Sequence, residues 1–285
     1  MMEKLQVVVR ENCHLGENPL WNPFDRELYW TDINFKKLYS FSPDQKGYRV
    51  ICQGEMVGGF TIQTDGSLLL FADGPGIKIW GKGKLIPVIE SIPGEENSRF
   101  NDVIAEPTGG VFCGTLSFNH LPGNLYYLST EGKLTEVIEN LFCSNGIGFS
   151  PDLKYFYLTD SGLRVIYRFN YDSSTSKLSG RQTLVEIPEE QGVPDGLTVD
   201  AKGCLWSARY SDSCVVRYRP KGKEIGRIDL PTKKVTSLTF GGEEYRDLYI
   251  TTAGGDKPEG ETDGYLFCLP QAGRGLPEFL SRIEI

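Results

Sequence analysis

The sequence predicts an all-β protein, a six-bladed β-propeller with a central channel, and two observations support that prediction. Its apolar runs are short, about four to eight residues each, rich in β-branched and aromatic residues, and bounded by Gly, Pro, Asp or Asn. Strand pairs also recur at a nearly constant interval along the chain. A repeat of roughly 40–50 residues that contains several strands is typical of a propeller blade.

Each repeat begins with a polar or small residue, followed by alternating apolar residues, a turn and a second strand. The segments that share this pattern are 17–30, 58–70, 101–114, 145–158, 195–208 and 236–250. Their first residues are separated by 41, 43, 44, 50 and 41 residues. Because six such repeats occupy nearly the whole chain, we expect one propeller domain over residues 1–285.

The second strand of each repeat is its most apolar run. We expect these strands at 27–33, 67–73, 110–116, 154–160, 204–210 and 247–253. The polar stretch 171–180 fits a hairpin tip within the fourth repeat. The run 5–10 has no partner in its own repeat, so we expect it to pair with a C-terminal strand near 265–269 and close the ring, which protects strand edges.

Composition excludes several classes of function. A formal net charge of −8 argues against nucleic-acid binding and against a polybasic membrane contact. We expect no membrane span, because no run of 18 apolar residues occurs, and no secretory signal in residues 1–10. Seven cysteines without a C-x-x-C motif favour reduced thiols and a cytoplasmic location, and two histidines cannot supply a three-histidine zinc site.

The repeat predicts a ring of side chains at one depth of the channel, because the first strand of each blade lines the axis. That ring consists of Glu17, Gly58, Asn101, Asn145, Asp195 and Thr236. Two carboxylates and two amides directed at one point must be paired with a cation, with bound water or with one another, because burying an unpaired carboxylate costs free energy. Hard divalent cations prefer such oxygen ligands. The ring therefore indicates either a metal site or a water-filled channel with polar walls.

Residues beside the ring add to this picture. Asn145 and Asp195 are each followed by glycine, which permits close approach of a backbone or a ligand. Arg99 lies two residues before Asn101 and hence on the same side of an extended strand. It places a fixed cation beside the ring, suited to a polar or anionic substrate, unless it forms a surface ion pair with Glu95 or Glu96.

Four motifs together resemble a known family. They are ENCHLGENPLWN at 11–22, SRFNDV at 98–103, SNGIGFS at 144–150 and VPDGLTVDAKGCLW at 193–206. In this order they are similar to motifs of the regucalcin/gluconolactonase family, also called the senescence marker protein family. The resemblance implies a six-bladed propeller with one divalent cation at the channel mouth, and hydrolysis of sugar lactones to aldonic acids.

The resemblance also assigns residues. Glu17, Asn145 and Asp195 match the metal ligands of the family. Arg99 and Asn101 match positions that hold the hydroxyl or carbonyl groups of the substrate. All-oxygen ligation favours Ca²⁺ as the cofactor, and Mg²⁺, Mn²⁺, Zn²⁺ or Fe²⁺ are possible alternatives.

One position departs from the family pattern. Regucalcin has an acidic pair shortly after a Gly-Thr-Met motif, and the second acid contacts substrate. Here the stretch is GTLSFNH at 114–120, and Asn119 stands where that glutamate would be. We expect Asn119 to contact the substrate, and the loss of the carboxylate points to a different lactone or a different lid position.

The expected function is a metal-dependent hydrolase that opens a small-molecule sugar lactone with metal-activated water. Asp195 is the expected catalytic base, although metal ligation would lower its basicity. Arg99 and Asn101 would orient the substrate and stabilise the developing oxyanion. Two alternatives are a non-enzymatic calcium-binding propeller and a metal-dependent phosphotriester hydrolase. The sequence leaves the oligomeric state open, a monomer included.

Overall fold

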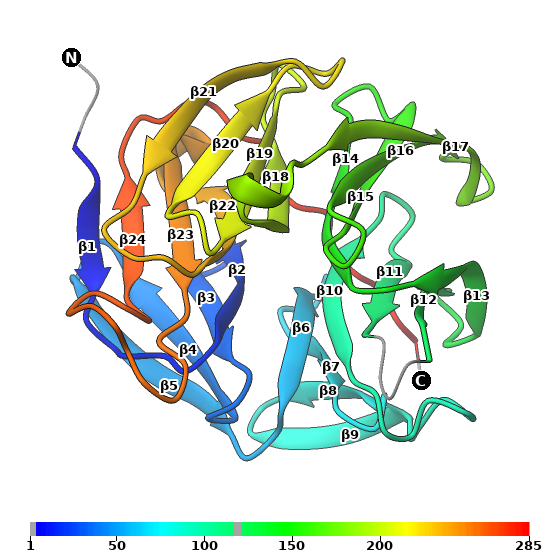
Figure 1. Ribbon diagram of the computed structural model, residues 1–285. Helices are drawn as coiled ribbons and strands as arrows, with labels where there is room; N and C mark the ends of the chain where they lie inside the picture. Colours follow the sequence, from blue (N-terminus) through cyan, green and yellow to red (C-terminus); the bar gives the residue numbers. More distant parts are fainter. Residues whose placement is uncertain (1–3, 117–120, 285) are drawn as a thin grey trace.

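The blades of the propeller are six four-stranded antiparallel sheets around a common axis (Figure 1). The computed structural model describes residues 4–116 and 121–284, and all six sheets lie within them. In five sheets the strands run in sequence order from the axis outward, and in the sixth the first strand of the chain is the outermost. The predicted all-β, six-bladed propeller is confirmed.

The strands form four layers from the axis outward, and every blade contributes one strand to each layer. The innermost strands are β2 (Gly16–Asn22), β6 (Val57–Ile62), β10 (Phe100–Ala105), β14 (Ser144–Phe149), β18 (Val193–Val199) and β22 (Val235–Gly241). The second strands are β3 (Glu27–Asp32), β7 (Leu68–Ala72), β11 (Val111–Thr115), β15 (Tyr155–Asp160), β19 (Leu205–Tyr210) and β23 (Asp247–Thr252). The third strands are β4 (Lys37–Ser42), β8 (Ile77–Gly81), β12 (Gly123–Leu128), β16 (Val165–Asp172), β20 (Cys214–Tyr218) and β24 (Leu266–Leu269). The outer strands are β5 (Gly47–Gln53), β9 (Lys84–Ile89), β13 (Leu134–Leu141), β17 (Lys177–Glu186), β21 (Glu224–Asp229) and β1 (Gln6–Val9).

The N-terminal strand closes the ring. β1 pairs antiparallel with β24, with Val7 opposite Phe267, so the last blade combines the first strand of the chain with its last three. This confirms the predicted pairing of segment 5–10 with a strand near 265–269. The outer edge of β24 is thereby covered without an additional element.

Apolar side chains fill the spaces between neighbouring blades. Phe71 of β7 meets Phe100 of β10 edge to face, with ring centroids 5.2 Å apart. Trp206 of β19 meets Phe240 of β22 in the same way at 5.6 Å. Both faces of an inner blade strand are buried in this way: in β7, Leu69 and Phe71 pack in one core cluster and Leu68 and Leu70 in another.

Several smaller features also agree with the sequence. The turn between β16 and β17 falls within 171–180, the stretch that predicts a hairpin tip. Two short 3₁₀ turns occur, η1 (Glu189–Gln191) and η2 (Glu243–Tyr245). No disulfide joins any of the seven cysteines, all of which lie in the described part of the chain, and six are buried. Over the described residues, no helix has the length and apolarity that crossing a bilayer would require.

The C-terminal segment 270–284 crosses the back of the ring, drawn in red in Figure 1. At one end, Gly275 N donates to Tyr245 O and Ala201 N to Arg274 O, both at 2.8 Å. At the other end, Ser281 N donates to Ile62 O at 2.9 Å, and Arg282 N to Gly109 O at 2.8 Å. The segment therefore connects the blades that begin with β18 and β22 to the blades that begin with β6 and β10, across the axis.

Candidate active site and metal centre

Every inner strand is irregular at its ring position. The pairing with the second strand shifts register between Glu17 and Leu20, Val57 and Gly59, Phe100 and Val103, Asn145 and Ile147, Pro194 and Leu197, and Val235 and Ser237. A bulge bends a strand and redirects its side chains, and bulges are frequent beside active sites. Equivalent bulges in all six blades turn the ring residues toward one end of the channel.

Three carboxylates interact at this end of the channel. Glu17, Asp102 and Asp195 are 5%, 7% and 7% exposed. Burial raises the pKa of Glu17 well above its usual range, and Asp195 and Asp102 raise it further. Burial and the charge on Asp102 also raise the pKa of Asp195, and burial raises the pKa of Asp102 to about 7. A nearby positive charge would stabilise the ionised forms of all three.

The amide of Asn145 has a defined orientation. Ser161 Oγ donates to Pro194 O at 2.6 Å, so its only proton is used. Ser161 can then only accept from Asn145, whose Nδ2 lies 3.1 Å from Ser161 Oγ. Because the amide nitrogen is directed at Ser161, the carbonyl oxygen Oδ1 is directed away from it. The same serine joins the strand of Asn145 to the residue before Asp195.

Two buried oxygens of the ring have no hydrogen-bond partner in the described structure, Asn145 Oδ1 and Asp195 Oδ1. Buried acceptors are normally satisfied, so a pair of orphan oxygens at one site calls for a ligand. No three His, Cys, Asp or Glu side chains form a metal-binding group in residues 4–116 and 121–284, so a candidate ligand set must include an amide. Two carboxylates and an amide oxygen, from Glu17, Asp195 and Asn145, fit a hard divalent cation.

Arg99 lies at the same site. Its Nη1 donates to Asn101 Oδ1 at 2.8 Å and to Phe100 O at 2.9 Å, and Asn101 Nδ2 donates to Ser144 O at 2.9 Å. Burial lowers the pKa of Arg99, while Glu17 and the other site carboxylates oppose that shift. Among the described residues Arg99 forms no ion pair with Glu95 or Glu96, the predicted alternative.

The other two ring positions serve packing. A Cβ at Gly58 would lie 1.9 Å from Phe100 O and 3.3 Å from Arg99 Nη1, so only glycine leaves room for this backbone and for the guanidinium. Thr236 Oγ1 donates to Gly16 O at 2.5 Å and so joins the last blade to the first. These two positions therefore shape the ring without adding a charge.

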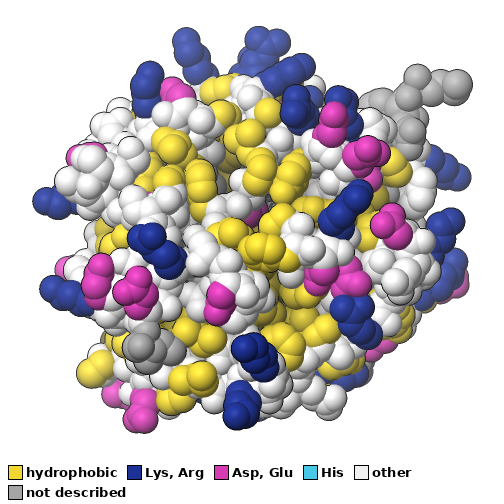
Figure 2. All heavy atoms as spheres, turned by 180° about the vertical axis from the view of Figure 1, so that it is seen from behind, with side chains coloured by type: hydrophobic (Ala, Val, Ile, Leu, Met, Phe, Trp, Pro, Cys, Tyr) yellow, Lys and Arg dark blue, Asp and Glu magenta, His cyan; other side chains and the backbone are white. Residues whose placement is uncertain are grey.

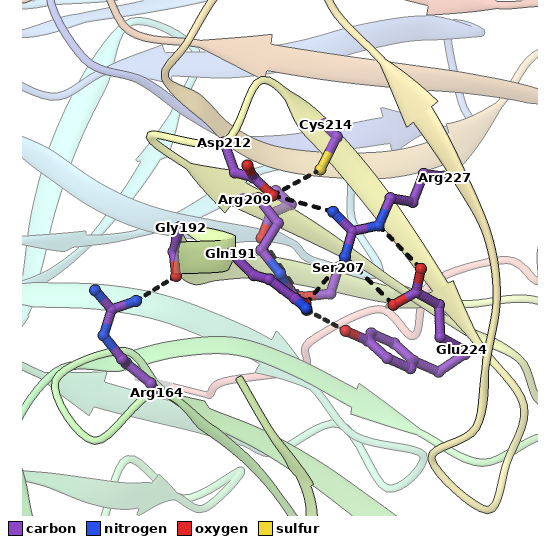
Figure 3. A network of polar contacts seen from close by, with 11 residues as sticks. Arg164, Gln191, Gly192, Ser207, Arg209, Asp212, Cys214, Glu224 and Arg227 are labelled. Atoms are coloured by element: carbon purple, nitrogen blue, oxygen red, sulfur yellow. Dashed lines mark hydrogen bonds and ion pairs between the residues drawn. The ribbon is translucent and has the colours of Figure 1, made fainter. Parts of the chain in front are cut away.

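The chain that enters the strand of Asp195 is held by arginines from two blades (Figure 3). Arg164 donates to Gly192 O, and Arg227 Nη2 donates to Gln191 Oε1 at 2.9 Å. Behind this strand, Arg209 is fully buried and donates to Ser207 Oγ at 2.6 Å. This network stabilises the loop and strand that present Asp195.

Comparison with known proteins places the chain in a family. The SMP-30/Gluconolactonase/LRE-like region matches residues 15–254. The chain belongs to the SMP-30/gluconolactonase/LRE-like family. Pentonolactonase XacC of Haloferax volcanii is 41% identical to this family member over 98% of each chain. Regucalcin of Danio rerio is 32% identical over 88% of this chain and 86% of its own.

Solved structures of the family have the same fold. The calcium-binding protein regucalcin from Agrobacterium tumefaciens superimposes with a TM-score of 0.92 at 25% identity, covering 99% of this chain and 98% of its own. A luciferin-regenerating enzyme superimposes with a TM-score of 0.90 at 25% identity, covering 99% of this chain and 100% of its own. The likeness extends over the whole ring of blades.

Two residues of this family member's site are not evident from its sequence. Asp102 follows Asn101 and would face away from it in a regular strand, but the strand pairing is irregular between Phe100 and Val103, and Asp102 lines the channel. Tyr210, the last residue of β19, is partly buried, and burial together with the charges of Asp195 and Glu17 raises its pKa. Asn119, the expected substrate contact, lies outside the described residues.

Proposed function

We propose that this protein is a divalent-metal-dependent lactonase that opens sugar lactones to aldonic acids. The observation that carries the proposal is the pair of orphan oxygens on Asn145 and Asp195 beside the Arg99 guanidinium. The relative of 41% identity is a pentonolactonase, so a five-carbon sugar lactone is the first substrate to test. Calcium is the proposed cation, because the ligand set contains only oxygen.

Glu17, Asn145 and Asp195 would hold the cation. When bound, a divalent cation supplies Lewis acidity toward a carbonyl oxygen and lowers the pKa of water. Glu17 acts as a ligand only, and its Oε2 accepts from Asn18 N at 3.2 Å, which fixes the carboxylate. Ser161 keeps the oxygen of Asn145 directed to the site.

Asp195 is the proposed general base. One of its carboxylate oxygens accepts a proton from the attacking water as the water oxygen bonds to the lactone carbonyl carbon. When the ring C–O bond breaks, Asp195 returns this proton to the leaving oxygen, which becomes the hydroxyl of the aldonic acid. Burial keeps the carboxylate away from bulk water, so the proton passes between Asp195 and substrate.

Arg99 is the proposed oxyanion donor. Only its Nη1 is used in the bonds to Phe100 O and Asn101 Oδ1, so within the described structure its other N–H groups are open to a substrate. Asn101 restrains the guanidinium and contributes to the polar wall that receives sugar hydroxyls. Tyr210, whose phenol feels the charges of Asp195 and Glu17, is a further candidate donor to a sugar hydroxyl. A charge-assisted donor aimed at the carbonyl oxygen stabilises the transition state more than the ground state.

A hydrolysis assay tests the proposal. Pentonolactones and hexonolactones are offered to the protein with a pH indicator, and we expect turnover that EDTA removes and Ca²⁺ restores. Asn145→Ala should lose turnover and Ca²⁺ affinity, whereas the exposed Asn170→Ala should lose neither. Ca²⁺ binding without lactone turnover would favour a non-enzymatic calcium-binding protein, and faster turnover of phosphotriesters would favour a phosphotriester hydrolase.

A further inference from the structure

The end of the channel opposite the ring contains a second cavity. Its volume is about 400 Å³, and its walls come from the last residues of β10, β14 and β18 and from the C-terminal segment. The ring residue Asn145 is the second residue of β14, whereas Phe149 at the end of that strand lines the cavity. With about 3.3 Å of rise per residue, the two levels are about 13 Å apart. The cavity is thus separate from the candidate active site.

The walls of this back cavity are mostly apolar. Side chains from the inner strands include Ile104, Ile147 and Phe149, and the crossing segment adds Leu276 and Phe279. Hydrophobic side chains gather at the centre of this face when the molecule is seen from behind (Figure 2). A cavity of this size and lining falls within the range of small-molecule sites, roughly 300–1,000 Å³.

One carboxylate, Glu278, lines this apolar cavity. It also lines the narrow channel that leads to Asp102. Glu278 makes no hydrogen bond or ion pair with any described residue, and the arginines of its own segment do not pair with it. Arg282 donates to Thr108 O instead. Burial raises the pKa of Glu278, as expected for a carboxylate among apolar side chains.

Two other carboxylates of this protein, Glu106 and Asp200, have dedicated side-chain donors. Glu106 accepts from Tyr171 Oη at 2.6 Å and from Tyr127 Oη at 3.1 Å. Asp200 accepts from Trp206 Nε1 at 3.0 Å and also pairs with Arg217. Glu278, whose side chain is only partly buried, has no such donor among the described residues, so its carboxylate is available to a ligand in the cavity.

The segment that carries Glu278 is anchored on both sides of the cavity. Gly275 is bonded to Tyr245, and Ser281 is bonded to Ile62, while Phe279 packs edge to face on Phe149 at 6.0 Å. The carboxylate is thus presented by a bridge with fixed ends. A preformed site loses less conformational freedom on binding than a mobile one.

We propose that the back cavity binds a small organic ammonium ion with an apolar body. The ammonium group pairs with the Glu278 carboxylate, and an alkyl or aryl body contacts the side chains around Phe149 and Leu276. A neutral apolar molecule would leave the carboxylate unpaired, and an anion would be repelled by it. This site is independent of the proposed lactonase reaction, because neither the cation ligands nor Arg99 contribute to it.

Binding of 2-phenylethylamine, followed by isothermal titration calorimetry in saturating Ca²⁺, tests the proposal. The neutral isostere 2-phenylethanol is the comparison ligand. We expect the amine to bind at least tenfold more tightly than the alcohol. Glu278→Gln should weaken amine binding at least tenfold and leave alcohol binding unchanged, whereas the matched control Glu284→Gln, an exposed carboxylate of the same segment, should change neither.

The front of the channel also contains carboxylates, so the amine must be shown to bind elsewhere. Asp195→Asn should bind the amine as the wild type does. Equal affinity of wild type and Glu278→Gln, equal affinity for amine and alcohol, loss of amine binding in Asp195→Asn, or no binding at millimolar concentration would each overturn the proposal. The comparison of amine and alcohol uses the wild type alone, so it remains decisive if a variant fails to fold.

Discussion

Replacing Ser161 by alanine removes a hydroxyl that makes two buried hydrogen bonds at once. Ser161 Oγ accepts from Asn145 Nδ2 and donates to Pro194 O. Without it, an amide donor and a backbone acceptor lose their partners in the interior. Each buried unsatisfied group costs about 1–3 kcal/mol, so we expect Ser161→Ala, which leaves two, to lower the free energy of unfolding by about 2–6 kcal/mol. For a chain of this size that is a fall in melting temperature of roughly 3–10 °C.

The same substitution should weaken metal binding. Once Nδ2 has no acceptor, the amide of Asn145 can rotate and direct its nitrogen instead of Oδ1 at the site. Loss of a group that orients a metal ligand typically costs about 10–100-fold in metal affinity. Calorimetric titration with Ca²⁺ measures this loss, and thermal melting of the metal-free protein measures the change in stability separately.

A matched control separates the two effects. Ser40 is also a fully buried serine, but its Oγ has no hydrogen-bond partner in the described structure. Ser40→Ala should therefore keep the Ca²⁺ affinity of the wild type and lose little stability. If Ser161→Ala melts at a lower temperature yet binds Ca²⁺ as the wild type does, Asn145 is not a ligand oriented by Ser161.

The site and the crossing segment support three further predictions. Asp195→Asn at saturating metal should lose about 10²–10⁴-fold in turnover, because it keeps an oxygen ligand but removes the base, and an unaltered rate would exclude Asp195 as the base. Gly58→Ala should lower kcat/KM for the lactone and keep the Ca²⁺ affinity, because the added Cβ would collide with Phe100 O and crowd Arg99. Unchanged kinetics would mean that the backbone at Phe100 moves aside without displacing Arg99. Burial raises the pKa of Glu278 from 4.5 to about 7, so the folded state holds this proton more tightly, and the free energy of unfolding should fall as pH rises through that window. Glu278→Gln should then melt at a higher temperature than wild type at pH 8 and at nearly the same temperature at pH 4, and equal melting at pH 8 would contradict the argument.

The blade pattern is readable from sequence because it depends on local properties. Each blade repeats the same short apolar runs bounded by turn residues, and a strand with a period of two directs alternate side chains to its two faces whatever blade it occupies. The repeat interval then aligns residues such as Glu17, Asn145 and Asp195 at one level without knowledge of any contact. The pairing of β1 with β24 was predictable for a similar reason, since an unpartnered strand at one end needs a partner at the other.

The details of the candidate site depended on the tertiary structure. Alternation alone would turn Asp102 away from Asn101 and gives no reason to place it in the channel, where the irregular pairing between Phe100 and Val103 brings it. The hydrogen bonds that orient Asn145 come from Ser161 and, through it, from Pro194, which belong to later parts of the chain.

The back cavity is likewise a feature that only the tertiary structure reveals. Glu278 and Phe279 read as ordinary residues of a C-terminal tail, and no pattern in the sequence assigns them to the channel. They become part of a cavity because Ser281 is hydrogen-bonded to Ile62 and Gly275 to Tyr245, so the tail crosses the axis. Strand identity and ring position follow from neighbouring residues, whereas side-chain direction, hydrogen-bond partners and enclosure are set by segments far apart along the chain.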